Sequence, residues 1–455
     1  MCLPSPHRLN TSEVPGVIAF FLVVVLALLA LVHWYVWRRL VRDVTAPRGL
    51  ARRIATGVVI ALPLLSVAAL ASGRAGAPFL FQQVVAWPGF LWLAVLLYLV
   101  LALAVGEAVR PLLSRWLARR AAAAPAAAPV TVTAPVTAPV PVPERTAEPE
   151  PKAEGETEAK AEPEAEPEAG AVVERPVAPE VSRRLFVARV VGGAAAAAAA
   201  GTVANGAYGV LRGPKVKRVT VPLAKLPRAA HGYRIAVVSD IHLGPILGRA
   251  HSQRIVDAIN ATQPDLIAVV GDLVDGTVEN LGPAAEPLAR LRARHGSFFV
   301  TGNHEYFSGA DAWVDHVREL GMRPLRNERL EIPAGFDLAG VDDVAGESEG
   351  QGPDFARALG DRDRSRAAVL LAHQPVVIDD AVAHGVDLQL SGHTHGGQLW
   401  PGNLLAELAN PTVAGLERYG DTQLYVSRGA GAWGPPVRVG APSDITVVQL
   451  ASKQA

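Results

Sequence analysis

The chain has 455 residues, enough for two or three domains, and its 43 Lys and Arg residues balance 43 Asp and Glu residues. This balance excludes any inference about binding partners from net charge. Half of the residues are apolar, and the excess lies mainly in the first 110 positions, which is typical of a membrane protein.

Three long uncharged stretches occupy that first part of the chain. They are Gly16–Trp37, Ile54–Ser72 and Val84–Val109, and each is long enough to cross about 30 Å of hydrocarbon as a helix. We therefore predict a three-helix transmembrane region over residues 1–120. The alternative is that these stretches are core helices of a soluble domain, which are usually shorter.

Basic residues indicate how these helices are oriented. Only Arg74 lies between the second and third stretches, whereas six arginines lie between the first and second and four more follow the third. Because short cytoplasmic loops are rich in Lys and Arg, the sequence predicts that the N-terminus is outside the cytoplasm. The arginines on the predicted cytoplasmic side are Arg38, Arg39, Arg42, Arg48, Arg52, Arg53, Arg110, Arg115, Arg119 and Arg120.

Residues 121–181 are mostly Ala, Pro, Val, Thr and Glu, and this composition predicts a disordered linker. The following segment, residues 182–212, begins with the sequence SRRLF and continues as an apolar stretch over Val190–Leu211. It is similar to a twin-arginine export signal and could form a fourth transmembrane helix. The alternative is an Ala-rich helix with two incidental arginines. If the stretch spans, the C-terminal domain is outside the cytoplasm; if it does not, that domain is cytoplasmic.

The C-terminal part, residues 213–455, has the pattern of an α/β domain. Short apolar runs alternate with segments of helical period such as Gln253–Ile259 and Ala284–Leu291. The runs are rich in Val, Ile and Leu without alternation, so they are expected to be strands covered on both faces. The clearest runs are Ile235–Val238, Leu266–Val270, Phe298–Val300, Val369–Ala372 and Leu388–Leu390.

Residues of metal-ligand type follow each of these runs. Since open α/β sheets bind ligands at the carboxyl ends of their strands, the side chains should converge. Asp240 and His242 are two apart, so an extended backbone would project both to one face, and His393 and His395 repeat the spacing. Without a thiolate, the set suits Mn, Fe, Zn or Co. The full set is Asp240, His242, Asp272, Asn303, His304, His373, His393 and His395.

Five ordered blocks over Tyr233–Leu450 resemble the calcineurin-like metallophosphoesterase superfamily. The segment Leu424–Gly431, with GAPSDITVVQL near the end, is further similar to the membrane-associated bacterial branch of that superfamily. The blocks read SDIH, GDLVD, GNHE, AHQP and GHTHGGQ. The resemblance implies an αββα sandwich, here preceded by the transmembrane helical region, and two divalent metal ions.

The resemblance also implies residue roles. Asp240, His242 and His395 would hold the first ion, and Asn303, His373 and His393 the second. Asp272 would bridge the two ions, and His304 would face the substrate phosphate as a catalytic residue.

The predicted function is hydrolysis of a phosphomonoester or phosphodiester by a hydroxide that bridges the two metal ions. The substrate could be lipid-linked or part of the cell envelope, with the catalytic domain on the outer face of the membrane and no nucleic-acid partner. The alternative is an inactive scaffold protein with the same fold. Asp275 and Glu305 could accept hydrogen bonds from ligand imidazoles; the alternative is that they are solvated loop carboxylates or caps. His251 is expected on the surface. Without a long insertion between His304 and His373, the cleft should be small and open.

Overall fold

The computed structural model describes residues 14–123 and 183–455. Of the linker predicted over residues 121–181, only the first three residues belong to this part, where they end a helix. The rest of the predicted linker lies outside the described residues.

Four long helices precede the α/β domain. They are α1 (Val14–Trp37), which continues into a short π-helix (Arg38–Arg42), α2 (Leu50–Ser72), α3 (Phe79–Ala123) and α4 (Arg183–Leu211). All four are long and apolar enough to cross a membrane. Helix α3 has 45 residues and is therefore about 68 Å long, roughly twice the hydrocarbon thickness. It is much longer than the predicted span, so part of it must lie outside the hydrocarbon.

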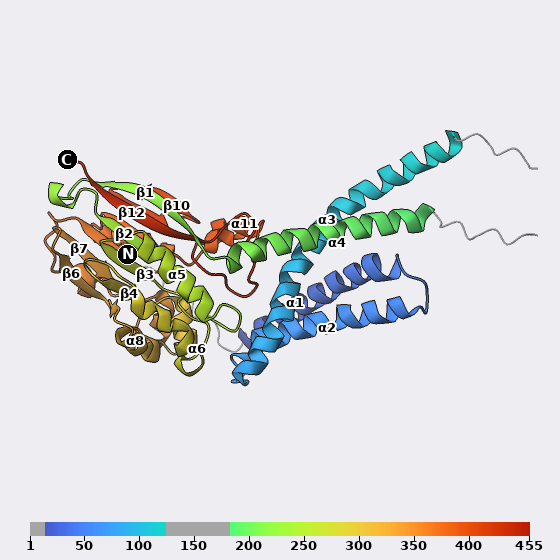
Figure 1. Cartoon of the computed structure of the whole chain (residues 1–455), viewed down its shortest axis with the longest axis horizontal. Helices are drawn as coiled ribbons and strands as arrows, with labels where there is room; N and C mark the ends of the chain where they lie inside the picture. Colours follow the sequence, from blue (N-terminus) through green and yellow to red (C-terminus); the bar gives the residue numbers. More distant parts are fainter. Residues whose placement is uncertain (1–13, 124–182) are drawn as a thin grey trace, which may run out of the picture.

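The arginine-rich ends of the helices lie together, far from the α/β domain (Figure 1). The connection between α1 and α2, the end of α3 and the start of α4 share this position, whereas the α2–α3 connection is next to the domain. Glu107 of α3 joins two of these segments, because its carboxylate lies 2.8 Å from Arg39 and accepts a hydrogen bond of 2.9 Å from Tyr35.

Two six-stranded sheets form the α/β domain. Going across the first sheet, the order is β1 (Lys215–Leu223), β12 (Asp444–Ser452), β2 (Arg234–Val238), β3 (Leu266–Val270), β4 (Ser297–Val300) and β5 (Arg323–Pro324). The second sheet runs β10 (Gly415–Tyr419), β11 (Thr422–Val426), β9 (Leu388–Ser391), β8 (Ala368–Leu371), β7 (Phe336–Gly340) and β6 (Glu328–Ile332).

The five strands predicted from the apolar runs, β2, β3, β4, β8 and β9, are buried on both faces, as their composition predicted. In β2, Ile235 and Val237 pack into the core between the sheets, while Ala236 and Val238 pack under the outer helices. Helices α5 (Arg249–Ala261), α6 (Val278–Ala285) and α8 (Ala310–Glu319) cover the first sheet; α9 (Phe355–Leu359) and α10 (Ile378–Ala383) cover the second. The predicted αββα sandwich is therefore confirmed. The helix expected over Ala284–Leu291 is partly wrong, because α6 ends at Ala285 and a 3₁₀-helix (Glu286–Arg290) follows.

The helical region packs directly against the α/β domain. The carbonyl of Gly206 in α4 accepts a hydrogen bond of 3.3 Å from the backbone N–H of Arg438, and the hydroxyl of Tyr98 in α3 donates to the carbonyl of Trp400 at 3.0 Å. Val210 near the end of α4 packs with Leu247 of the domain. These contacts hold the edge of the sandwich that contains Leu247, Trp400 and Arg438 beside the helical region.

Candidate metal centre

All of the predicted ligands lie at one edge of the sandwich. Strands β2, β3 and β4 are parallel in the first sheet, and β8 and β9 are parallel in the second, so their carboxyl ends meet there. Each strand is followed by one cluster of the predicted set. The clusters are Asp240 and His242 after β2, Asp272 after β3, Asn303 and His304 after β4, His373 after β8, and His393 and His395 after β9.

Asp240, His242 and His395 form the first ligand group. Nε2 of His395 lies 3.3 Å from Oδ1 of Asp240 and 3.0 Å from Nε2 of His242. Nε2 of His242 is also 3.7 Å from Oδ2 of Asp272, which connects this group to the second. Asp240 and His242 are fully buried, so their polar atoms have no access to bulk solvent.

The second ligand group contains Asp272, Asn303, His373 and His393. Nε2 of His373 lies 3.1 Å from the same Asp272 oxygen, Oδ2, and Nδ1 of His393 lies 3.0 Å from Oδ1 of Asn303. The Asp272 carboxylate is therefore shared by the two groups, which is the position that a bridging ligand requires.

These groups fit divalent cations. Two ligand atoms that bind one ion at about 2.1 Å and at right angles lie about 3 Å apart, close to the separations described above. Nδ1 of His242 is 2.9 Å from Oδ1 of Asp275, and Nδ1 of His373 is 2.9 Å from the carbonyl of Val270. A ring that donates through Nδ1 keeps its Nε2 lone pair for a metal. Burial lowers the pKa of His393 to about 4, which keeps this ligand neutral.

The backbone of the site is strained. Among the described residues, nine non-glycine residues have positive φ, and five of them are predicted ligands. Such strain is typical of functional sites. The extended backbone expected for the Asp240–His242 and His393–His395 pairs is therefore wrong, because tight turns after the strands, rather than alternation, direct these side chains. The five ligands are Asp240 (51°), His242 (48°), Asp272 (54°), His393 (72°) and His395 (53°).

Two glycines are required by the close approach of these segments. A Cβ atom at Gly302 would overlap the carboxylate of Asp272, and a Cβ atom at Gly392 would overlap the carboxylate of Asp240. The sequence motifs GNHE and GHTH contain these glycines, which allow the turns to pack against the carboxylates.

Asp275 and Glu305 both contact the site, but in different ways. Asp275 accepts from His242 and lies 2.6 Å from Nδ1 of His304, as predicted for an imidazole acceptor. Burial opposes its ionisation, but His242 and His304 outweigh burial and lower the pKa of Asp275 to about 2. Glu305 contacts no ligand imidazole and instead matches the alternative of a cap, because it closes the capping box at the start of α7 (Asn303–Ser308). Its buried carboxylate accepts backbone N–H groups of Gly302, Asp272 and Leu273 at 2.6, 2.9 and 2.8 Å.

Three residues near the site had no predicted role. Arg438 is buried and donates to the carbonyl of His395 at 2.9 Å, with Nη2 also 2.9 Å from Nδ1 of that ring. The Trp433 ring lies edge-on to His304, with centroids 5.7 Å apart. The expectation that His251 lies on the surface is wrong, because it belongs to the buried face of α5 and is only 1% exposed. Nothing local in the sequence distinguishes Arg438 or Trp433 from packing residues.

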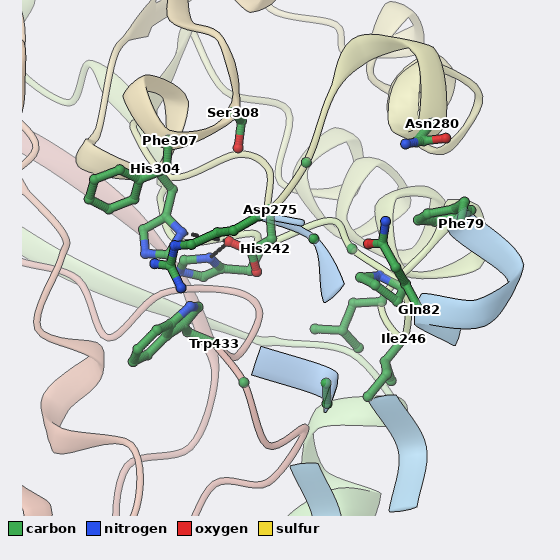
Figure 2. Close-up of a pocket in the computed structure, with 18 of the residues that line it drawn as sticks. Phe79, Gln82, His242, Ile246, Asp275, Asn280, His304, Phe307, Ser308 and Trp433 are labelled. Carbon is green, nitrogen blue, oxygen red and sulfur yellow. Dashed lines mark hydrogen bonds and ion pairs between the residues drawn. The ribbon is translucent and has the colours of Figure 1, made fainter. Parts of the chain in front are cut away.

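A cavity of about 400 Å³ adjoins the site. His242, Asp275 and His304 line one end, and the opposite wall comes from α2, α3 and the connection between them. Figure 2 shows the three polar residues together with Phe307 and Trp433, facing Phe79 and Gln82 of α3 across the cavity. The expectation of an open cleft is therefore wrong, because the helical region supplies a wall that the domain sequence does not contain.

A sandwich of this kind with carboxylate, amide and imidazole groups at the strand ends defines the class of metallophosphoesterase domains. Residues 233–397 match the family model for calcineurin-like phosphoesterases. A metallophosphoesterase of Aquifex aeolicus is 35% identical over 243 residues, which cover 52% of this chain and 92% of that protein. The chain belongs to the calcineurin-like phosphoesterase family.

The chain spans just over half the length of some other relatives. A zebrafish protein named transmembrane protein with metallophosphoesterase domain is 40% identical over 255 residues, which cover 53% of this chain and 58% of that protein. Among solved structures, a dimetal phosphatase from zebrafish has a TM-score of 0.36 and 11% identity, covering 49% of this chain and 93% of that one.

Proposed function

We propose that this protein is a membrane-anchored phosphoesterase that uses two divalent metal ions to hydrolyse a phosphomonoester or phosphodiester. The observation that carries the proposal is the shared Asp272 carboxylate, with Oδ2 3.1 Å from Nε2 of His373 and 3.7 Å from Nε2 of His242. Asp240, His242 and His395 would hold one ion, Asn303, His373 and His393 the other, and Asp272 would bridge them. We propose Mn, Fe, Zn or Co as the ions, because the set has oxygen and imidazole donors without thiolate.

When bound, two such ions would acidify a water molecule and offset negative charge on the phosphate. In the net reaction, the oxygen of one water molecule bonds to phosphorus, the bond from phosphorus to the leaving alcohol breaks, and a proton goes to the alcohol oxygen. His304 lines the cavity, and Asp275 holds its Nδ1 at 2.6 Å. This arrangement directs Nε2 of His304 away from Asp275, where it can donate a proton to the leaving oxygen.

For the membrane topology, we propose four crossings with the catalytic domain outside the cytoplasm. Support comes from the grouping of the arginine-rich helix ends far from the domain and from the position of Arg74, in the α2–α3 connection, beside it (Figure 1). Arg183 and Arg184 at the start of α4 support export by the twin-arginine machinery, which carries folded proteins. Exchange of both arginines for lysine should leave the domain protected when intact cells are treated with protease. Digestion of the domain in that variant would exclude this export route.

The proposed activity can be tested with the full chain in detergent and added Mn²⁺. We expect hydrolysis of a nitrophenyl phosphodiester, and we expect Asp272→Asn to lower both the rate, by at least about 1,000-fold, and the bound metal. Asp257→Asn, an exposed carboxylate on α5, is the matched control. Equal rates for wild type and Asp272→Asn would overturn the proposal.

A further inference from the structure

The cavity beside the metal centre is built from two parts of the chain that differ in chemistry. One wall belongs to the catalytic edge, where His242, Asp275 and His304 present polar atoms. The other wall belongs to the membrane helices, where Leu70 of α2 and Phe79 and Phe90 of α3 present apolar side chains. The cavity therefore joins the polar atoms of the metal centre to apolar side chains of the helices, with Arg74 and Gln82 as polar members of the helical wall.

The apolar end adjoins the surface that would face lipid. Leu70 lines the cavity and is 44% exposed, and the neighbouring Leu80, which does not line it, is 72% exposed. Apolar helix surface of this kind is expected in contact with lipid chains. A ligand that reaches the metal centre through this end must pass along the outer ends of α2 and α3.

Arg74 supplies positive charge to the lining of the cavity. It lies in the six-residue connection between α2 and α3, and among the described residues that line the cavity it is the sole arginine or lysine. Within the described part of the chain, its side chain makes no ion pair. A guanidinium in this position suits a phosphate oxygen, which it can bind through two parallel hydrogen bonds.

We infer that the substrate is a membrane amphiphile of phospholipid type, with its phosphate at the metal centre, an anionic oxygen on Arg74, and an acyl chain along Leu70, Phe79 and Phe90. This inference rests on the proposed function and specifies its substrate. A soluble substrate would not need an apolar wall, and it would not need that wall to be formed by the membrane helices. The volume of about 400 Å³ is within the usual range for small-molecule sites and accommodates a headgroup with the start of a chain.

The test uses two phosphodiesters that share a nitrophenyl leaving group and differ in the second ester, which is methyl or dodecyl. Both are given to the full chain in nanodiscs with Mn²⁺. We expect kcat/KM to be at least about 100-fold higher for the dodecyl ester, because burial of only four methylene groups accounts for such a factor. Leu70→Gln should lower the ratio of the two kcat/KM values about 10-fold, whereas Leu80→Gln, the matched control, should leave it unchanged. Arg74→Gln should raise KM for both esters, with partial recovery in Arg74→Lys.

Partition of the dodecyl ester into the nanodisc also raises its rate of hydrolysis, so a higher kcat/KM for this ester does not by itself test the inference. The effect of Leu70→Gln on the ratio of the two kcat/KM values does. A ratio unaffected by Leu70→Gln while both esters are hydrolysed would overturn the inference and leave the proposed function intact. If neither ester is hydrolysed, the proposed function fails. The inference is then tested by a phospholipid with a photoreactive group in its chain, which should crosslink to Leu70 or Phe90. Crosslinks confined to the outer helix surface, without either residue, would overturn it.

A second inference concerns helix α11 (Gly402–Ala409), which carries exposed apolar side chains. Leu404, Leu405 and Leu408 are 55%, 71% and 84% exposed, and none of the residues of α11 is buried. The helix lies beside the end of α4 (Figure 1), and the carbonyl of Trp400, two residues before the helix, accepts a hydrogen bond from Tyr98 of α3. This apolar face is therefore continuous with the helices that cross the membrane.

We infer that α11 inserts its leucine face into the membrane surface next to the catalytic edge. An amphipathic helix at the headgroup boundary gains stability from apolar burial in this way. Because Cys2 is the sole cysteine of the chain, Cys2→Ser provides a background for single labels. A polarity-sensitive fluorophore on Leu408→Cys should emit at shorter wavelength in nanodiscs than the same label on Glu331→Cys, on the distant strand β6. Equal emission from the two positions would overturn the inference.

Discussion

Glu305 holds Asp272 in place through the backbone rather than through a side chain. The Glu305 carboxylate accepts hydrogen bonds from the backbone N–H groups of Asp272 at 2.9 Å and Leu273 at 2.8 Å, 33 and 32 residues away in the sequence. Its third partner is the N–H of Gly302 at 2.6 Å. One buried carboxylate thus fixes the two turns that carry Asp272 and Asn303, which belong to different strands of the first sheet.

Glu305→Gln should therefore weaken metal binding. The amide has one acceptor oxygen in place of two, and its NH₂ group would face backbone donors, so at least one buried N–H loses its partner. We expect metal affinity to fall about 10- to 100-fold, the usual effect of changing a group that orients metal ligands. Metal titration of the full chain measures this, with Glu319→Gln on the exposed face of α8 as the control. Affinity within twofold of wild type would show that Glu305 does not position the ligands.

His304→Gln should affect catalysis without removing metal. The His304 ring lines the cavity and contacts Asp275. Residue 304 contacts the shared Asp272 carboxylate only through its backbone N–H, at 2.9 Å from Oδ1, and the substitution keeps this bond, so the metal content should stay unchanged. For an alkyl phosphodiester we expect kcat to fall about 10²- to 10⁴-fold, as for loss of a general acid. For a nitrophenyl ester the fall should be smaller, since its leaving group needs less protonation. An equal fall for both esters would contradict the assignment of His304 as the acid.

Much of this arrangement could be predicted from the sequence, because local patterns determine it. Doubly buried strands such as β2 and β3 have Val- and Ile-rich runs, and the ligands follow each run directly. The conformation of the turns could not be predicted, since Asp240 and His242 adopt positive φ that only the opposing strand ends impose. The contacts of Arg438 depend on a segment more than 40 residues beyond His395 in the chain. The wall of the cavity that α2 and α3 provide could not be predicted either, because it depends on packing between the helical region and the α/β domain, and neither sequence indicates that packing.

Stability should depend on pH through His251. This buried residue of α5 has two ring nitrogens that lack a hydrogen-bond partner among the described residues. Burial lowers its pKa to about 4, and the positive charges of Arg254 and Arg438 add to this effect. In the unfolded chain the pKa is about 6.5, so below that pH the unfolded state binds a proton that the folded state excludes. The free energy of unfolding should fall by up to about 3 kcal/mol as the pH drops from 6.5 to 4.

Thermal unfolding of the full chain, followed by tryptophan fluorescence between pH 7.5 and 4.5, measures this loss. His251→Leu should reduce the pH dependence, because it removes the group that titrates and keeps an apolar side chain in the same space. Control substitution of the half-buried His384, which follows α10 over the other sheet, should leave the slope as in wild type. A slope in His251→Leu equal to that of wild type would assign the acid sensitivity to other groups.

The junction between α4 and the catalytic domain should be sensitive to side-chain size at Gly206. A Cβ atom there would lie 2.7 Å from Cγ1 of Val437 and 2.8 Å from the carbonyl oxygen of Arg438, which is too close for either to remain in place. Gly206→Val should therefore displace the segment that carries the Arg438 guanidinium away from His395. We expect a loss of about 1 to 3 kcal/mol in stability, as for other overpacked sites, together with a lower kcat. Gly209→Val in the same helix is the matched control, because a Cβ atom there meets nothing within 4 Å. If both variants melt and react alike, the contact between Gly206 and Arg438 has no part in supporting the site.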